Sequence, residues 1–167
     1  GLPKILLQLN IDYADGERQE IYTEYGTSWC VARGPITYNA LYDGEDYDAR
    51  MEKDGWDAPE YEPTALLEHQ RPGGWIMASI VEDPGGERIS EIMPPIQICD
   101  VFDPVLIRTF DDGTKIYNVG KNITGWVEIQ VSGEAGSKVL LSFAEVLDEN
   151  GRLEKTPLRS ARCEDHY

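Results

Sequence analysis

Short segments of alternating polar and apolar residues, separated by turn signals, are the feature that most constrains the fold of this chain. In residues 4–13 every second side chain is apolar: Ile5, Leu7, Leu9, Ile11 and Tyr13. This period of two is typical of a half-buried strand. Asp15-Gly16 then supplies a tight-turn signal. Residues 19–23 are therefore predicted to return as the second arm of a hairpin.

The same reasoning predicts further short strands along the chain. They cover residues 27–32, 75–81, 88–92, 96–101, 105–110, 115–119, 125–131 and 138–143. Residues 34–63, dense in acids, Tyr, Gly and Pro, are predicted to form a long ordered loop, and residues 63–68 one or two helical turns. About ten short strands and at most one short helix indicate an all-β fold. We expect an antiparallel β-sandwich or jelly roll, built as one sandwich or as two partial ones.

The charge balance excludes two classes of partner. The 167 residues carry 15 Lys and Arg against 31 Asp and Glu, a formal net charge of -16. Binding to nucleic acid draws its affinity from cationic side chains, and anionic membrane surfaces attract the same groups. We therefore expect neither nucleic acid nor a membrane as a partner. The apolar runs are also far shorter than the ~20 residues of a membrane helix.

The acidic segment 42–50 admits three interpretations. Asp43, Glu45 and Asp48 could supply oxygen ligands for calcium, although their spacing differs from the twelve-residue calcium loop. Two of the acids could act as a glycosidase pair, which requires a separation in space of about 5 Å or roughly 6.5 to 9.5 Å that sequence does not reveal. The favoured interpretation is a structural loop in which Arg50 pairs with an acid.

Aromatic residues suggest a sugar-binding function. A pyranose stacks its apolar face on a ring while carboxylates and amides bind its hydroxyl groups. Trp56 and Tyr61 lie in the irregular segment and are the better candidates. Trp29, Trp75 and Trp126 lie on strand patterns and are predicted to belong to the core.

Motifs for covalent or phosphate chemistry are missing. The sequence has no glycine-rich phosphate loop and no G-x-S-x-G nucleophile elbow, and its two histidines, His69 and His166, are far apart. We therefore assign no catalytic residue within the chain.

A set of motifs, in this order, resembles bacterial α-L-rhamnosidases and covers nearly the whole chain. The motifs are Leu7 to Gly16, Gly34-Pro35-Ile36, Tyr42 to Glu45, Tyr47 to Arg50, Gly55-Trp56, Met93 to Ile96, Gly120-Lys121-Asn122, Gly125-Trp126-Val127, Phe143 to Leu147 and Leu158 to Ala161. The resemblance implies a large multidomain inverting glycosidase that removes terminal α-L-rhamnose. It further implies that the catalytic carboxylates lie in a downstream (α/α)6 barrel and that this chain matches the non-catalytic β-sandwich region before it.

The resemblance also implies a domain division. Residues 1–104 would form the family's N-terminal β-sandwich region, entered mid-domain, and residues 105–167 the start of a second sandwich that is cut before its last strands. Some family members carry a sandwich module that binds rhamnose with the help of calcium. The resemblance does not place the ligands of that site in this chain; Asn39 is the position to inspect, and its neighbour is Tyr38 rather than a carboxylate, so calcium stays open as a cofactor.

Two functions follow as hypotheses. The chain is a non-catalytic fragment of an α-L-rhamnosidase that supports the catalytic domain and contacts a rhamnose-containing glycan. Alternatively, it is a stand-alone, lectin-like carbohydrate-binding module. The candidate sugar contacts are Asn39, Asp43, Glu45, Asp48, Arg50, Trp56 and Tyr61. A truncated sandwich has open strand edges, so we also expect self-association of the fragment.

Overall fold

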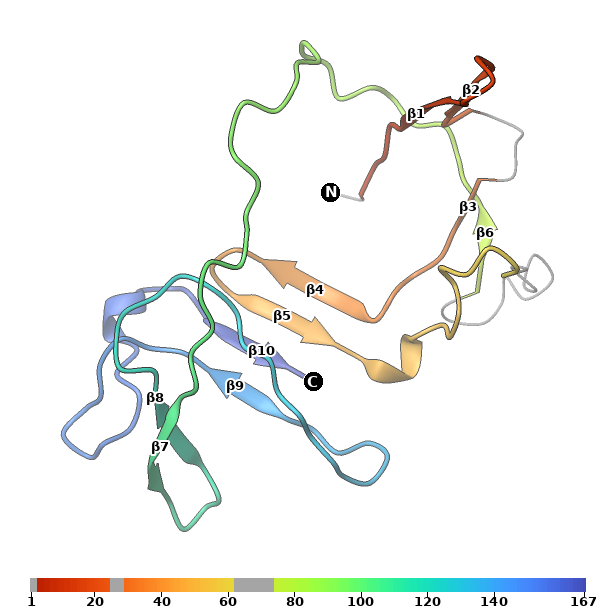
Figure 1. Ribbon diagram of the computed structural model, residues 1–167. Helices are drawn as coiled ribbons and strands as arrows, with labels where there is room; N and C mark the ends of the chain where they lie inside the picture. Colours follow the sequence, from red (N-terminus) through yellow and green to blue (C-terminus); the bar gives the residue numbers. More distant parts are fainter. Residues whose placement is uncertain (1–2, 25–28, 62–73) are drawn as a thin grey trace. The chain divides into compact units, whose positions relative to one another are not determined.

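The computed structural model describes residues 3–24, 29–61 and 74–167, and their regular structure is almost entirely β-strand (Figure 1). The strands are β1 (Gln8–Asp12), β2 (Arg18–Tyr22), β3 (Cys30–Val31), β4 (Ile36–Ala40), β5 (Gly44–Tyr47), β6 (Ile76–Met77), β7 (Val105–Thr109), β8 (Lys115–Asn118), β9 (Leu140–Ser142) and β10 (Glu164–His166). Two single-turn 3-10 helices, η1 (Ala49–Met51) and η2 (Thr156–Leu158), complete the set. The predicted all-β class is confirmed. The helical turns predicted at 63–68 fall outside the described residues.

The chain divides into two compact units. The first comprises Gly1–Thr37 and Asp48–Arg88, and the second comprises Tyr38–Tyr47 and Ile89–Tyr167. Residues 38–47 thus belong to the second unit although they lie between two segments of the first. Neither unit has, in its described residues, a helix with the length and hydrophobicity of a membrane span.

The first unit contains two small antiparallel pairs. β1 and β2 form the predicted hairpin, with Gln8 opposite Tyr22 and Asp12 opposite Arg18. Gly16 in the connecting turn has a φ of +89°, a left-handed conformation that glycine adopts without steric cost. β3 pairs with β6 over two residues, so within the described residues 29–32 and 75–81 the strands are shorter than predicted, and residues 27 and 28 of the first prediction lie outside the described part.

A four-stranded sheet with the order β4-β5-β10-β9 dominates the second unit. β10 runs parallel to β5, with His166 opposite Asp46, and antiparallel to β9, with Glu164 opposite Ser142. The prediction of a continuous loop over 34–63 was therefore wrong for residues 36–47. Residues 44–47 are too polar to show an alternation, residues 36–40 alternate over only five positions, and the strand that pairs with β5 lies 120 residues further along the chain.

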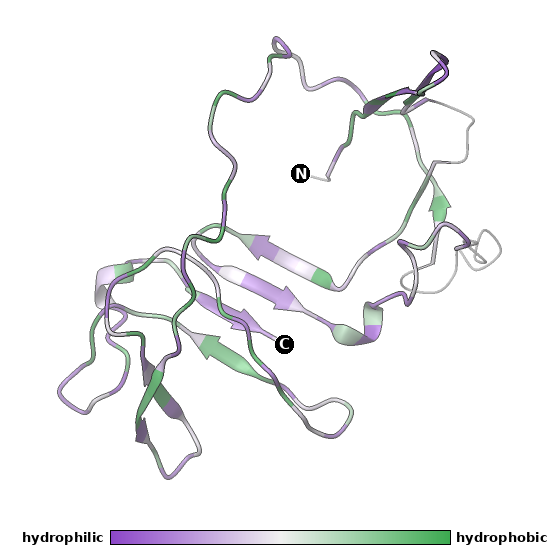
Figure 2. Ribbon diagram, in the orientation of Figure 1, coloured by the Kyte–Doolittle hydropathy of each residue, from purple (hydrophilic) through white to green (hydrophobic). Residues whose placement is uncertain are grey.

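β7 and β8 form the second predicted hairpin, with a bulge between Leu106 and Arg108. Ile116 on β8 is the one hydrophobic side chain among the described residues that is buried, at 6% exposure. Figure 2 shows mostly hydrophobic residues on β9 and hydrophilic ones on β10. The described part of the sheets therefore has little closed core of its own.

Three predicted strands, over residues 88–92, 96–101 and 125–131, are not formed. An alternating pattern favours an extended backbone, but a strand also requires a neighbour for its backbone hydrogen bonds. Within the described residues these segments pair with no ladder partner. Trp126, predicted to belong to the core, is 67% exposed, whereas Trp29 and Trp75 are half-buried.

Candidate functional site

The hairpin of β4 and β5 brings together the first candidate residues. The Asn39 side-chain amide donates a hydrogen bond to Glu45 Oε2 at 3.0 Å. The Glu45 backbone N–H donates to Asp165 Oδ1, on β10, at 2.9 Å. The Asn39 amide thus meets the Glu45 carboxylate, while the Asp165 carboxylate holds the Glu45 backbone, and these side chains keep further hydrogen-bonding capacity.

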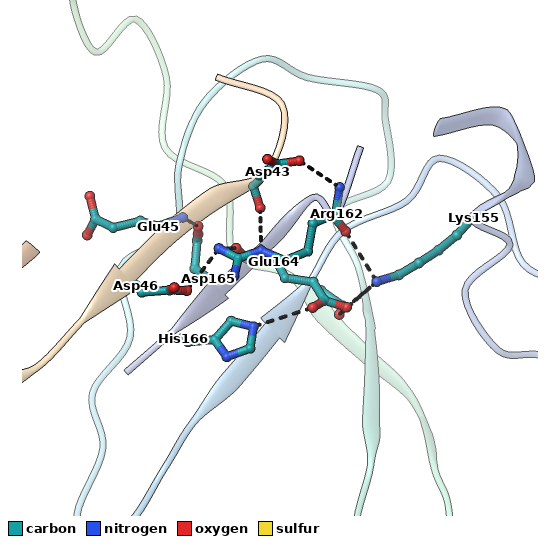
Figure 3. Close-up of polar contacts among 9 residues, drawn as sticks. Asp43, Glu45, Asp46, Lys155, Arg162, Glu164, Asp165 and His166 are labelled. Atoms are coloured by element: carbon teal, nitrogen blue, oxygen red, sulfur yellow. Dashed lines mark hydrogen bonds and ion pairs between the residues drawn. The ribbon is translucent and has the colours of Figure 1, made fainter. Parts of the chain in front are cut away.

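Asp43, in the turn between β4 and β5, lies between the Tyr38 hydroxyl and Arg162, and Figure 3 shows its contacts with Arg162. Tyr38 Oη donates to Asp43 Oδ2 at 2.7 Å, and the Arg162 backbone N–H donates to Asp43 Oδ1 at 3.2 Å. These bonds stabilise the carboxylate, and they hold the pKa of Asp43 below its usual value, with the Tyr38 hydroxyl as the main cause. The same bond raises the pKa of Tyr38. Asp43 is thus held as an anion by groups of its own chain.

Arg162 binds the hairpin with its side chain as well. Its Nε donates to the Asp43 carbonyl at 3.0 Å, and its Nη2 lies 2.9 Å from Asp46 Oδ1. Although that Asp46 oxygen lacks a hydrogen bond of good angular geometry, the short charge separation makes the pair an ion pair. The contact with Asp46 is the main reason that the pKa of Arg162 is raised. Arg162 therefore acts as a cationic clamp on the turn and the following strand.

Glu164 on β10 is the centre of a second polar cluster (Figure 3). It forms an ion pair with Lys155, and it accepts a hydrogen bond from Ser142 Oγ, on β9, at 3.0 Å. His166 Nε2 lies 3.4 Å from its other oxygen. Lys155 is the main cause that lowers the pKa of Glu164. This cluster joins β9 to β10 and leaves no carboxyl group with a raised pKa, as a general acid would need at neutral pH.

Two tyrosine rings lie beside the Asn39 and Glu45 pair. Tyr47 and Tyr167 have ring centroids 5.7 Å apart at 46°. Burial is the main cause that raises the pKa of Tyr167, and the charges of Asp165 and Glu45 add to it. Because side chains alternate along a strand, Glu45 and Tyr47 share a face of β5, as Asp165 and Tyr167 share a face of β10. Rings next to carboxylates and an amide are chemically suited to a saccharide.

The other candidates lie in the first unit. Asp48 caps η1 by accepting from the Arg50 backbone N–H, and it also accepts from Arg50 Nε at 2.8 Å and Nη2 at 2.7 Å. This pairing lowers the pKa of Asp48 and raises that of Arg50. Their role is thus local: they pair with each other, as the structural interpretation of segment 42–50 predicted.

The two aromatic candidates differ in exposure. Trp56 is 63% exposed. Tyr61 is half-buried, accepts a hydrogen bond from Trp75 Nε1 at 3.0 Å, and has its ring centroid 6.0 Å from that of Trp75. The hydrogen bond occupies the Tyr61 hydroxyl, so Trp56 presents the more accessible ring of the two.

For calcium, the described residues offer no group of three or more Asp, Glu, His or Cys side chains placed to hold a metal ion. Each of the three loop acids has a different partner: Asp43 bonds Tyr38, Glu45 bonds Asn39 and Asp48 bonds Arg50. The acids that are close in sequence are therefore spread over separate contacts.

Sequence reasoning missed the contributions of the C-terminal segment. Arg162, Asp165 and Tyr167 complete the surroundings of Asp43, Glu45 and Tyr47 from more than a hundred residues away. No local pattern pairs β10 with residues 44–47.

The comparisons with known proteins agree with the motifs. Residues 1–100 match the family described as "Alpha-L-rhamnosidase N-terminal domain", and residues 108–167 match the "Bacterial alpha-L-rhamnosidase concanavalin-like domain". This chain belongs to the α-L-rhamnosidase family. The resemblance inferred from the sequence is thereby confirmed.

Individual α-L-rhamnosidases show the extent of the match. An α-L-rhamnosidase of Streptomyces avermitilis is 34% identical over 165 residues, which is 99% of this chain and 15% of that protein. One from Alteromonas sp. is 29% identical and is covered to 17% of its length. The solved structure of the Dictyoglumus thermophilum α-L-rhamnosidase superimposes with a TM-score of 0.81 at 35% identity, covering 97% of this chain and 17% of that one. The chain thus spans about a sixth of the α-L-rhamnosidases it matches.

Proposed function

We propose that this chain is a non-catalytic β-sandwich region of an α-L-rhamnosidase, a glycoside hydrolase that releases terminal α-L-rhamnose. In this proposal the region supports a catalytic domain encoded outside these residues and contacts the rhamnose-containing glycan. Residues 1–104 form the first sandwich region and residues 105–167 belong to the second. The observation that carries the proposal is the match of both segments to successive non-barrel domains of one enzyme family.

The chemistry of three described acids, Asp43, Asp48 and Glu164, fits a structural role. A glycosidase needs one carboxyl group that stays protonated as an acid and a second that is ionised. Asp43, Asp48 and Glu164 all have pKa values below the ordinary range, and each is held by a hydroxyl, a guanidinium or an ammonium group. Such carboxylates are suited to stable structural contacts.

For glycan contact we propose the surface around Asn39 and Glu45, with Tyr47, Asp165 and Tyr167 beside it. The Glu45 carboxylate and the Asn39 amide can exchange hydrogen bonds with sugar hydroxyls, and the tyrosine rings offer apolar area. The solved Streptomyces avermitilis relative, 32% identical with a TM-score of 0.80, is described as complexed with L-rhamnose, which motivates the choice of sugar.

Calorimetric titration of the chain with L-rhamnose, with and without calcium, tests glycan contact. We expect saturable heat at millimolar sugar, and a loss of affinity of about tenfold in Asn39→Ala, since removing one hydrogen-bonding partner in a polar site costs roughly 1 to 1.5 kcal/mol. Asn10→Ala, a strand asparagine in β1, is the matched control and should bind as the parent chain does. Absence of heat, or equal affinity in Asn39→Ala, would reject this contact.

A further inference from the structure

The sheet of the second unit is assembled from two different family domains. β4 and β5 lie within the 1–100 segment that matches the N-terminal domain, whereas β9 and β10 lie within the 108–167 segment that matches the concanavalin-like domain. The boundary between the two domains therefore passes through the sheet, between β5 and β10. The sequence expectation of two consecutive modules gives no hint of this exchange.

Backbone contacts across this junction extend beyond the short ladder. The Cys163 N–H donates to the Tyr42 carbonyl at 3.1 Å, and the Glu164 N–H donates to the Asp43 carbonyl at 3.0 Å. Side chains then fix the register from both sides. Arg162 binds the turn at Asp43, and the Asp165 carboxylate accepts from the Glu45 N–H. The parallel pairing of β5 with β10 has a single bridge, so the side chains of Arg162 and Asp165 specify which residues lie opposite each other.

Gly44 marks how closely the two segments approach. A Cβ atom built at this position would lie 2.1 Å from the Glu164 carbonyl oxygen, far inside the normal contact distance. Gly44 also has a φ of +95°, in the left-handed region. Only glycine satisfies both conditions, so the turn sequence is matched to the strand that docks against it.

Charge defines the kind of partner that the β10 edge accepts. Arg162 is placed between the turn residue Asp43 and the strand residue Asp46, on a chain with a net charge of -16. A guanidinium in this position favours a strand that starts with an acidic turn, because one cation can pair with the acid and with the turn carbonyl.

We propose that the hairpin 36–47 is a docking element, through which the N-terminal-domain sequence is anchored to the concanavalin-like domain, and that the β10 edge with Arg162 is its receptor. The first unit is then tethered to the second at three chain crossings, after residues 37, 47 and 88. This anchoring does not depend on whether the surface binds sugar.

Hydrogen exchange on the full chain tests the proposal with two glycine variants. Gly44→Ala should speed exchange of the Cys163, Glu164 and Glu45 amides by about tenfold or more, because it adds the steric overlap to the strain of a left-handed Ala. Gly113→Ala is the matched control: its φ is +84° and nothing lies within 4 Å of its Cβ. It should leave those three amides unchanged. Equal rates for them in the two variants would overturn the proposal.

If Gly44→Ala unfolds the whole chain, a stabilising variant decides. Tyr42→Cys introduces a thiol at the residue whose backbone carbonyl accepts a hydrogen bond from the Cys163 N–H. Mild oxidation should then yield a disulfide between positions 42 and 163, identified by peptide mapping. Cys30 and Cys99 are the competing thiols of the same chain. Disulfides that join position 42 to Cys30 or Cys99 as often as to Cys163 would contradict docking of the hairpin on β10.

Discussion

Two arginine side chains stack on one phenyl ring at the end of β7, and removing that ring should loosen the hairpin. Arg108 Cζ lies 4.5 Å from the centroid of Phe110, and Arg152 Cζ lies 4.1 Å from it. Arg108 also donates to the Asn150 carbonyl at 2.7 Å. The ring therefore joins the β7–β8 hairpin to the turn at residues 148–152.

Phe110→Leu keeps most of the apolar volume and removes both cation–π contacts. Such contacts contribute about 0.5 to 1 kcal/mol each at exposed sites, so the two together contribute about 1 to 2 kcal/mol. A free energy of this size changes an opening equilibrium by roughly 5- to 30-fold. Phe110→Tyr retains the aromatic face and should change it by less than about threefold, within the range of an ordinary surface substitution.

Hydrogen exchange of the hairpin amides measures this effect directly. The reporter is the Phe110 N–H, which donates to the Thr114 carbonyl at 2.9 Å, together with the amides of β7 and β8. We expect the Leu variant to exchange faster and the Tyr variant to resemble the parent chain. If the Leu variant exchanges at the parent rate, or if both variants change equally, the stacking argument is wrong.

Two further predictions concern the same hairpin. The Thr114 N–H and, next, the Arg152 guanidinium lower the pKa of Asp112 from 3.8 to about 2. The contribution of Asp112 to stability is therefore complete above about pH 4 and is lost as the pH falls through about 2. In an acid titration followed by circular dichroism, Asp112→Asn should flatten the stability profile within that pH window. Ile116→Ala should lower the free energy of unfolding, measured in urea, by about 2 kcal/mol, which is the low end for a buried aliphatic side chain because few neighbours enclose it. The control Ile107→Ala removes a side chain that is 49% exposed and should lower that free energy by less than about 1 kcal/mol. Equal effects of the two substitutions would contradict the assignment of Ile116 to the core.

Locally encoded features were the ones that sequence predicted well. Both two-stranded hairpins follow from an Asp-Gly turn between extended segments, and Gly16 and Gly113 indeed adopt the left-handed conformation that these turns require. The information lies within about fifteen residues of chain in each case. The class of fold follows from many such short segments.

Features that depend on a distant partner were predicted poorly. β5 was taken for a loop because its acidic sequence shows no hydrophobic period and its partner β10 lies far along the chain, whereas the short alternation in β4 was overlooked. Residues 125–131 show the opposite error, since they alternate clearly and yet form no ladder in the part of the chain that the structure describes. Periodicity specifies a face of a strand, whereas pairing requires a second segment that the pattern does not name.

The candidate site was predicted in part. The sequence pointed to Asn39 and Glu45, which contact each other, and to Asp48 and Arg50, which form a local pair in the other unit. Arg162 was missed, because an isolated arginine among polar residues gives no sign of the acid that it binds. Contacts over 119 residues of separation become visible only in the fold.

The central claim is that the groups that break the glycosidic bond lie outside these 167 residues. Incubating the chain with a nitrophenyl α-L-rhamnoside and following release of nitrophenol tests it most directly. The account predicts release at the rate of the buffer blank. Turnover above the blank that disappears on substituting an Asp or Glu of this chain, such as Glu45→Gln, would contradict it.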